Sequence, residues 1–590
     1  MADQALGRLN QETFPSDPYG RLNQETFPSD PTTKNTVESI VGGGSVSVVN
    51  VSPRDVWTSV GMSRWWWYGE GLILAGAFAL AYTQGPLFYS NQNQYLLHGL
   101  AAAGVGYLQQ DWLANTRDPT PFFSYLVAVG YTNFGLVILH LTYFVLLLVY
   151  FLSFRWLVMA LPFWRETLPA RWGFAALFTA THAAGPRLLS VILTGTDYPW
   201  YLQCGVANQY LLGPGLQPSA FGVLLVSGLA AFAHGRFLWA GFLTGSACLF
   251  HFTYFLPVVL LVVGYVLAIL ADRSDQSSGG RALALLLAVS IVCLPMAVYT
   301  LFTFGSANPH TWSEAQRILV EVRIPHHAVI DRWFAGPDAF QLVWIACGLG
   351  IVRRCDWGKA LMVAALAGLL LSFVQYVSDS HLLALLFPWR ISALLVPTAT
   401  AIIIARLMQG IGDSPSLTYG SGILIGGLAV LGVMTMFLGW GYQMNADEEG
   451  LLAYVREHVQ QGDTYLLPVR FPAVRQGRGT ASTTFTPPPR PRPDSPLIPV
   501  DLQRFRLVTG APIYVDFKSI PYYDTEVLEW YRRMKQCEEW YTGGWNSLQR
   551  REELRAEGIT HVVTPASQPL FADYLRSVYQ DSAYILYRIE

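Results

Sequence analysis

Charged residues are scarce in this chain of 590 residues. Asp, Glu, Lys and Arg together make up 13% of it, whereas hydrophobic residues make up 52%. A soluble globular domain carries about 25% charged residues. The 38 basic and 40 acidic residues nearly balance, so the chain has no basic field that would attract nucleic acid. The composition excludes an ordinary soluble protein and predicts no nucleic-acid partner.

Close pairs of cysteines are also absent. The six cysteines stand apart from one another, at positions 204, 248, 293, 347, 355 and 537. A structural zinc site or a dithiol redox motif needs thiols only a few residues apart. The spacing therefore predicts neither kind of site.

Long uncharged runs account for the missing charge. Phe134–Leu152, for example, contains no charged residue. A helix needs about 20 apolar residues to cross the hydrocarbon layer, and backbone groups inside lipid must be satisfied within a helix. We therefore predict a mainly α polytopic membrane fold with about 11 transmembrane helices. The expected spans are 71–89, 134–152, 172–188, 218–234, 238–252, 254–271, 282–303, 339–352, 360–377, 389–407 and 421–442.

The sequence divides into three expected regions. Residues 1–64 are polar and contain the segment GRLNQETFPSDP twice, which predicts a disordered tail. Residues 65–445 hold the spans, and because nothing upstream of them resembles a signal peptide, the first span is expected to target the chain. Residues 446–590 are predicted to form a small α/β domain with a Pro/Arg-rich insertion at 477–499.

Apolar spacing within the last region predicts individual elements. Helices are expected at 447–461 and 525–541, and strands at 464–468, 513–517, 560–564 and 583–589. In the first long loop, the small apolar residues of Tyr95–Leu108 predict a helix lying along the membrane interface.

Basic residues in the short loops predict the orientation. With the N-terminus in the cytoplasm, five basic loops all lie on the cytoplasmic side: Arg155/Arg165/Arg171, Arg236, Arg273/Arg281, Arg353/Arg354/Lys359 and Arg406. An odd number of crossings then places residues 446–590 outside the cytoplasmic (inner) membrane. It gathers them with the long loops 90–133, 189–217 and 304–338.

The first long loop offers two carboxylates, Asp111 and Asp118. A carboxylate returned to the membrane surface can act as a general base towards a hydroxyl group. Alternatively, Asp111 caps a helix and Asp118 starts a turn.

The second long loop combines aromatic rings with amides and charges. Its candidate contacts to a sugar or an acceptor are Arg187, Asp197, Tyr201 and Gln217. Such a set suits the faces and hydroxyls of a sugar, and it equally suits an aromatic belt at the interface.

The third long loop concentrates hydrogen-bond donors in RILVEVRIPHHAVIDRW. Arg323, His326, His327 and Arg332 could together bind a phosphate or a pyrophosphate. Adjacent histidines do not share a helix face, so a divalent metal would need ligands from elsewhere, such as Asp111 or Glu321. Purely structural roles are the third alternative.

Two ionisable residues stand in apolar surroundings: His251, in CLFHFTYFLP, and Arg390, in LLFPWRIS. Ionisable groups at membrane depth are costly, which makes both residues functional candidates. Arg390 gives the stronger signal because a guanidinium cannot lose its charge, whereas His251 could be a packing residue.

Several of these segments carry a family resemblance. NQNQYLLHGL, DWLANT, CLFHFTYFLP, RIPHHAVIDRWF, LLFPWRIS and GAPIYVDFKSIPYYDTEVLEWYRR resemble a group of large, uncharacterised bacterial polytopic proteins. That group is similar to the GT-C class of glycosyltransferases, which use lipid-phosphate-linked sugars at the outer membrane face. In that class an acidic residue closely follows the first span. Here Asn91 and Asn93 stand there, and Asp111 comes later.

The resemblance implies a GT-C-like glycosyltransferase that uses a polyprenyl-phosphate-linked sugar. Asp111 would be the base, and Arg323, His326, His327 and Arg390 would hold the donor phosphate. A polysaccharide polymerase or ligase would use the same basic loops without an Asp base. A non-catalytic transporter or scaffold is the alternative from another class.

The predicted orientation can be tested with a reporter fused after Glu590. We expect the reporter to be active outside the cytoplasm, because all five basic loops agree on the same topology. A fusion to the Arg236 loop provides the control, which should report a cytoplasmic position. A cytoplasmic C-terminal reporter would contradict the odd number of crossings.

Overall fold

The computed structural model describes residues 64–271, 276–412, 414–442, 445–472 and 502–590. Apart from Arg64, the tail expected at 1–64 lies outside the described residues, as does the insertion expected at 477–499. Residues Ser63–Glu590 form one compact unit.

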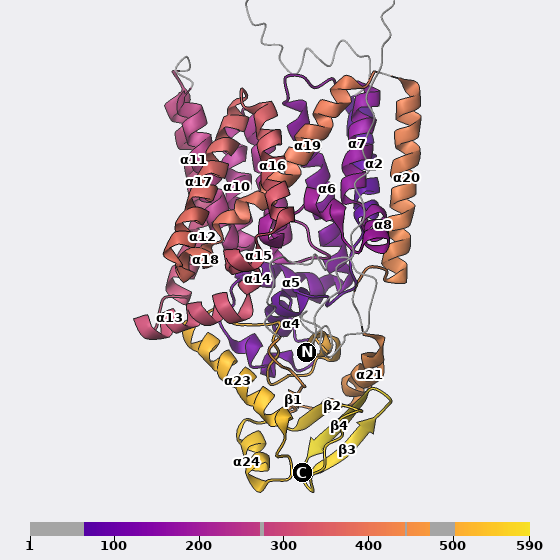
Figure 1. Cartoon of the computed structure of the whole chain (residues 1–590), viewed down its shortest axis with the longest axis vertical. Helices are drawn as coiled ribbons and strands as arrows, with labels where there is room; N and C mark the ends of the chain where they lie inside the picture. Colours follow the sequence, from indigo (N-terminus) through magenta and orange to yellow (C-terminus); the bar gives the residue numbers. More distant parts are fainter. Residues whose placement is uncertain (1–63, 272–275, 413, 443–444, 473–501) are drawn as a thin grey trace, which may run out of the picture. The chain divides into compact units, whose positions relative to one another are not determined.

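A helix lies at each of the expected spans. These helices are α2 (Arg64–Tyr82), α6 (Val137–Met159), α7 (Leu168–His182), α9 (Val223–Ala233), α10 (Phe237–Phe250), α11 (Phe255–Ala271), α12 (Ser278–Thr303), α16 (Gly336–Val352), α17 (Asp356–Ser378), α19 (Ser392–Gly410) and α20 (Pro415–Leu438). Figure 1 shows the long helices side by side, and α10 packs against α12, α11 against α17, and α2 against α20.

Length and apolarity support a smaller number of full crossings. Six described helical stretches are long and apolar enough to cross a membrane: Val137–Met159, Phe252–Ala271, Ser278–Thr303, Asp356–Ser378, His381–Gly410 and Pro415–Leu438. A seventh would consist of α7 with α8 (Ala184–Thr194), which meet at a bend of 47°. The predicted multi-pass helical fold is confirmed. The shorter apolar stretches, such as Phe237–Phe250, account for the difference from the expected number.

Short helices fill the loops between the long ones. They are α3 (Gln92–Tyr95), α4 (Leu97–Ala102), η1 (Leu108–Gln110), η2 (Leu113–Asn115), α5 (Pro121–Phe134), η3 (Tyr198–Leu202), η4 (Val206–Asn208), η5 (Pro218–Gly222), η6 (Phe252–Tyr254), α13 (Pro309–Arg317), the π-helix η7 (Ile318–Arg323), α14 (Pro325–Ala328), α15 (Ile330–Trp333), α18 (His381–Leu386) and η8 (Pro388–Ile391).

The helix predicted at Tyr95–Leu108 is much shorter in the structure. Tyr95 ends α3, α4 covers Leu97–Ala102 and Leu108 begins η1, and Leu97 and Leu100 of α4 are fully buried. Gly99 allows α4 to approach α5, because a Cβ atom there would lie 2.6 Å from the carbonyl oxygen of Ser124. The leucines therefore face protein, and the chain leaves the helix through glycines with positive φ.

The C-terminal region forms the predicted α/β domain. Its elements are η9 (Ala446–Glu448), α21 (Glu449–His458), β1 (Tyr465–Leu466), α22 (Phe505–Thr509), α23 (Asp524–Thr542), α24 (Leu548–Ala556), β2 (His561–Pro565), β3 (Leu575–Gln580) and β4 (Tyr584–Ile589). The strand order is β1-β2-β4-β3, with β1 parallel to β2 and the other pairs antiparallel (Figure 1).

The strand predicted at 513–517 is wrong. Ile513 makes only an isolated parallel bridge to Tyr465, and the segment then leaves the sheet. The backbone N–H of Ile513 donates instead to the carboxylate of Asp111, which lies in the first long loop. A long-range side-chain contact thus takes the place of a strand hydrogen bond.

Two glycines lie where the backbone of the first long loop packs tightly against that of the C-terminal domain. The backbone N–H of Tyr107 donates to the carbonyl oxygen of Gly510 at 2.8 Å. Gly106 has a φ of +52°, and a Cβ atom there would lie 2.7 Å from Cα of Gly510. No side chain fits between these two backbones.

We expect Gly106→Ala to lower the stability of the protein by about 2 to 4 kcal/mol, through left-handed backbone strain and overpacking. Gly104→Ala is the matched control, because Gly104 has a φ of +76° but a Cβ atom there would meet nothing within 4 Å. Thermal unfolding in detergent should show a larger loss for Gly106→Ala than for the control. Equal losses would mean that the contact with Gly510 contributes nothing.

Candidate functional site

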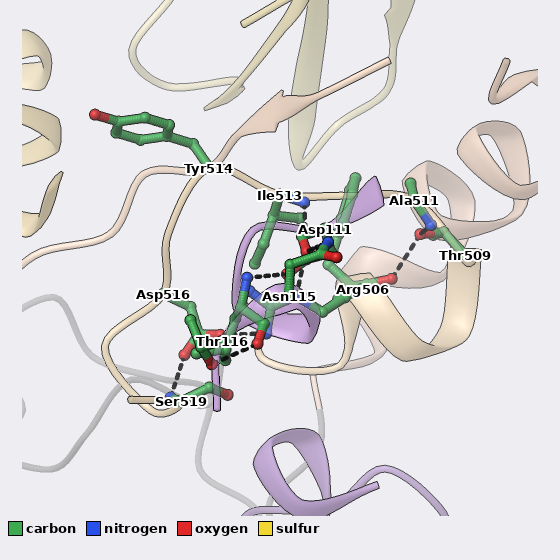
Figure 2. A network of polar contacts seen from close by, with 12 residues as sticks. Asp111, Asn115, Thr116, Arg506, Thr509, Ala511, Ile513, Tyr514, Asp516 and Ser519 are labelled. Carbon is green, nitrogen blue, oxygen red and sulfur yellow. Dashed lines mark hydrogen bonds and ion pairs between the residues drawn. The ribbon is translucent and has the colours of Figure 1, made fainter. Parts of the chain in front are cut away.

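Asp111, the predicted base, is fully buried and accepts three hydrogen bonds. Its Oδ1 accepts from the backbone N–H of Leu113 at 2.9 Å, and its Oδ2 accepts from the backbone N–H of Ile513 at 2.9 Å. Oδ2 also pairs with Nε of Arg506 at 2.8 Å (Figure 2). A carboxylate held in this way stabilises the fold, because a cation and two N–H groups offset the loss of its hydration.

Arg506 extends this ion pair to a second carboxylate. Its Nη1 lies 3.2 Å from Oδ2 of Asp516, and the arginine is 3% exposed. Oδ1 of Asp516 accepts from the backbone N–H of Ser519 at 2.6 Å, which closes a turn (Figure 2). We refer to Asp111, Arg506 and Asp516 as the ion network. Through it, one buried guanidinium connects the first long loop to the C-terminal domain.

The segment after this turn makes further contacts with the first long loop. Nε2 of Gln94 donates to the carbonyl oxygen of Ile520 at 3.2 Å and to the hydroxyl of Tyr522 at 3.0 Å. The guanidinium of Arg117 lies 3.2 Å from the centre of the Tyr523 ring. The position of the turn is therefore fixed on both sides.

Arg323 lies at the end of η7 and is only 6% exposed. Its Nη2 donates to the carbonyl oxygen of Lys518, and its guanidinium lies 5.3 Å from the centre of the Phe517 ring. Its Nε has no hydrogen-bond partner within the described part of the chain, where no carboxylate pairs with it either. Among these residues Arg323 is thus a buried cation without a salt bridge to a carboxylate, and the more distant charge of Asp516 opposes the lowering of its pKa by burial.

Arg390, in η8, is a second cation of the same kind. It is 9% exposed, its Nη1 donates to Oε1 of Gln209 at 2.7 Å, and its guanidinium lies 4.8 Å from the centre of the Tyr254 ring. Its Nε finds no hydrogen-bond partner among residues 64–271, 276–412, 414–442, 445–472 and 502–590, and no described carboxylate pairs with the guanidinium. Within these residues, the guanidinium of Arg390 contacts neutral groups.

The two adjacent histidines lie between these cations. Nδ1 of His327 is 2.8 Å from the carbonyl oxygen of Ala207, and the rings of His326 and His327 lie 4.2 Å apart. Burial lowers the pKa of His327 to about 4, and the charges of Lys518, Arg390 and Arg323 act in the same direction. Burial likewise lowers the pKa of His326, helped by His327, Arg323 and Lys518. Both rings are therefore neutral near pH 7.

Tyr95 is affected electrostatically by both arginines. Burial and Tyr522 raise its pKa well above the usual value, while Arg390 and Arg323 both oppose this rise. The ring of Tyr95 also lies 5.6 Å from the ring of His251. The structure thus brings Arg323, Arg390, His326, His327 and His251 together, whereas Asp111 is occupied by the ion network.

The candidates of the second long loop have mostly internal partners. Arg187 and Asp197 form a buried ion pair, with Nη2 and Oδ2 2.8 Å apart, and Arg187 lies over the ring of Trp200. The carbonyl oxygen of Tyr201 accepts a hydrogen bond from Gln341 at 3.3 Å. Gln217 is 3% exposed, and its Nε2 lacks a partner among the described residues. Their roles towards a sugar or an acceptor stay predictions.

Asp118 and Arg332 lie away from the buried cations. Oδ1 of Asp118 accepts from the backbone N–H of Thr120 at 2.8 Å, as a residue that starts a turn would do. Arg332 is exposed on α15. Neither residue contributes a described contact to Arg323 or Arg390.

A metal site finds no support in the described residues, which contain no group of three or more His, Cys, Asp or Glu side chains able to hold a metal ion. In particular, Asp111 is engaged with Arg506 rather than with the histidines. A metal requirement stays an untested alternative.

Sequence reasoning did not single out Lys518, Arg506 and Asp516. Burial, followed by the charge of Arg323, lowers the pKa of Lys518 to about 7, whereas Asp516 opposes this shift. The available signal was a carboxylate and an ammonium two residues apart inside the apolar run IYVDFKSI. Charges in such a run require partners, as they do at membrane depth.

We expect Asp111→Asn to destabilise the protein by about 3 to 5 kcal/mol, because Arg506 would keep a buried charge shared with Asp516 alone. Thermal unfolding of the full-length protein in detergent measures this loss. Asp118→Asn is the control and should have little effect. If Asp111→Asn unfolds like the wild type but loses all turnover, the prediction that Asp111 is a base gains support over a structural role.

Comparisons with known proteins give two kinds of similarity. A domain of unknown function (DUF6798) matches residues 491–537, a segment that contains Arg506, Asp516 and Lys518. No curated protein matches the chain. The crystal structure of ArnT from Cupriavidus metallidurans bound to undecaprenyl phosphate is similar at 14% identity, with a TM-score of 0.39, covering 89% of this chain and 98% of that one. The apo structure of the same protein gives 12% identity and a TM-score of 0.43, covering 91% and 98%. The match to a domain of unknown function agrees with the resemblance of these segments to an uncharacterised group.

Proposed function

We propose that the protein is a GT-C-like glycosyltransferase that takes a sugar from a polyprenyl-phosphate-linked donor at the outer face of the inner membrane. In this proposal the N-terminus is cytoplasmic and the C-terminal domain is extracytoplasmic. Arg323, His326, His327 and Arg390 hold the donor phosphate. One observation carries the proposal: two buried arginines have no carboxylate partner among the described residues.

An unpaired buried guanidinium is unfavourable unless a ligand supplies the missing anion. A phosphate group satisfies this need well, because its oxygens accept charge-assisted hydrogen bonds from the planar donors of arginine. The neutral histidines add N–H donors without adding further repulsion between cations. The unpaired Nε atoms of Arg323 and Arg390 are the available donors.

The position of Arg390 suits a lipid phosphate rather than a soluble one. It lies immediately before α19, within the stretch His381–Gly410 that is long and apolar enough to cross a membrane. A phosphate at this depth would leave its isoprenoid chain in the hydrocarbon layer. In this proposal the positive charge of the site lies at the level of a lipid head group.

The same cations would assist the transfer itself. When the bond between the anomeric carbon and the phosphate oxygen breaks, the departing phosphate gains a negative charge while the acceptor hydroxyl loses its proton. Arg323 and Arg390 would stabilise the charge that develops on the leaving group. Asp111 as the base stays a prediction, since proton acceptance would disturb its pair with Arg506.

We expect Arg390→Gln to weaken the binding of undecaprenyl phosphate by about 10- to 100-fold, the range of one or two charge-assisted hydrogen bonds. The same substitution should leave thermal stability unchanged or raise it, because it removes a buried charge that has no counterion among the described residues. Arg390→Lys should also bind weakly, since it lacks the planar fork. Binding to the full-length protein in detergent can be followed by ligand-induced thermal stabilisation.

Arg406→Gln is the matched control, because Arg406 lies on α19 but is exposed. It should bind like the wild type. The second measurement is release of the polyprenyl phosphate from a polyprenyl-phosphate-linked sugar. A wild-type protein that neither binds the lipid phosphate nor releases it would contradict the proposal and favour a non-catalytic transporter or scaffold.

A further inference from the structure

Lys518 lies beside Arg323 although it belongs to the C-terminal domain. The turn Asp516–Ser519 presents the carbonyl oxygen of Lys518 to Nη2 of Arg323, and the preceding Phe517 places its ring 5.3 Å from the same guanidinium. The C-terminal domain thus reaches a buried cation through the backbone of Lys518 and the ring of Phe517.

Two neighbouring cations repel each other, and their surroundings do not compensate. The lowered pKa of Lys518, about 7, arises from burial first and from Arg323 second. Asp516 is the carboxylate that favours the charged lysine, but it already pairs with Arg506. The positive potential of the site therefore exceeds what the described residues neutralise.

The ion network holds the turn in this position. Arg506 connects Asp111 to Asp516, and Asp516 in turn fixes the backbone N–H of Ser519. On the far side, Gln94 holds the carbonyl oxygen of Ile520. The location of Lys518 therefore depends on contacts with the first long loop rather than on the sheet of the C-terminal domain.

We propose that Lys518 is the third cation of the donor phosphate site, and that Asp111 is a positioning residue that holds Lys518 there through Arg506 and Asp516. This inference rests on the proposed function and adds that the C-terminal domain completes the site. It gives Asp111 the role of positioning a charge instead of accepting a proton.

The lysine makes phosphate binding dependent on pH. In the free protein Lys518 is charged below about pH 7 and becomes neutral as the pH rises, so its contribution to binding an anion is lost at high pH. Arg323, Asp516, His326 and His327 interact with it electrostatically, and Arg390 acts on the neighbouring His327. Both arginines stay charged near and above neutral pH, because a guanidinium does not lose its proton there. The lowered pKa values of the two histidines keep both rings neutral over the same range.

The test compares wild type, Lys518→Gln and Lys518→Arg in the full-length protein, with undecaprenyl phosphate as the probe. At about pH 6 we expect Lys518→Gln to bind about tenfold more weakly than wild type. The ratio of the two affinities should approach one at about pH 9, because the lysine is then neutral. Ionisation of the lipid phosphate cancels in this ratio. At about pH 9, Lys518→Arg should still bind undecaprenyl phosphate more tightly than Lys518→Gln does.

Lys535→Gln is the control, because Lys535 is an exposed lysine of the same domain. It should bind like the wild type. The double variant Asp111→Asn/Lys518→Gln should lose less affinity than the product of the fold-losses of the two single variants. Both substitutions act through the charge of Lys518. Equal affinities of wild type and Lys518→Gln at the lower pH would overturn this inference alone. Absence of binding by the wild type would instead overturn the proposed function.

Discussion

The contact between the first long loop and the C-terminal domain depends on one buried ion network. Asp111 and Arg506 are 395 residues apart in the sequence, yet they form an ion pair with almost no exposed surface. Removing either residue of a buried ion pair strongly destabilises the protein, because the remaining charge has lost its hydration and has no partner. Asp516 shares the same guanidinium. The position of the C-terminal domain against the first long loop is therefore fixed by electrostatics as well as by packing.

The distribution of charge separates structural groups from functional ones. Glu70 pairs with both Arg155 and Arg171, and Arg187 pairs with Asp197, so these buried charges have counterions within the chain. Arg323 and Arg390 contact carbonyl, amide and aromatic groups, none of which neutralises a cation. In the function we propose, these unbalanced cations are the ones that bind an external anion. This contrast, rather than the number of arginines, identifies the site.

Four separate parts of the chain meet at these cations. The second long loop provides Gln209, the third provides Arg323 and the histidines, η8 provides Arg390, and the turn Asp516–Ser519 provides Lys518. The apolar helices set the depth of Arg390, whereas the ion network sets the position of the turn. If this is the donor site, as we propose, it draws on residues of both the helical region and the C-terminal domain.

The sequence by itself determined the classes of structure. Uncharged runs of sufficient length can only be helices in lipid, and the spacing of apolar residues after the last run predicts an α/β domain. The sequence also marked Arg390, because charge in apolar surroundings is costly, and Arg323, His326 and His327, because they concentrate donors for a phosphate. Only the tertiary structure decided the partners of those charges. A local pattern could not reveal that Asp111 faces Arg506, nor that Ile513 gives its N–H to that carboxylate instead of to a strand. The physical reason is that hydrophobicity acts through local composition. Whether a buried charge is stabilised depends instead on which distant group lies within about 3 Å of it.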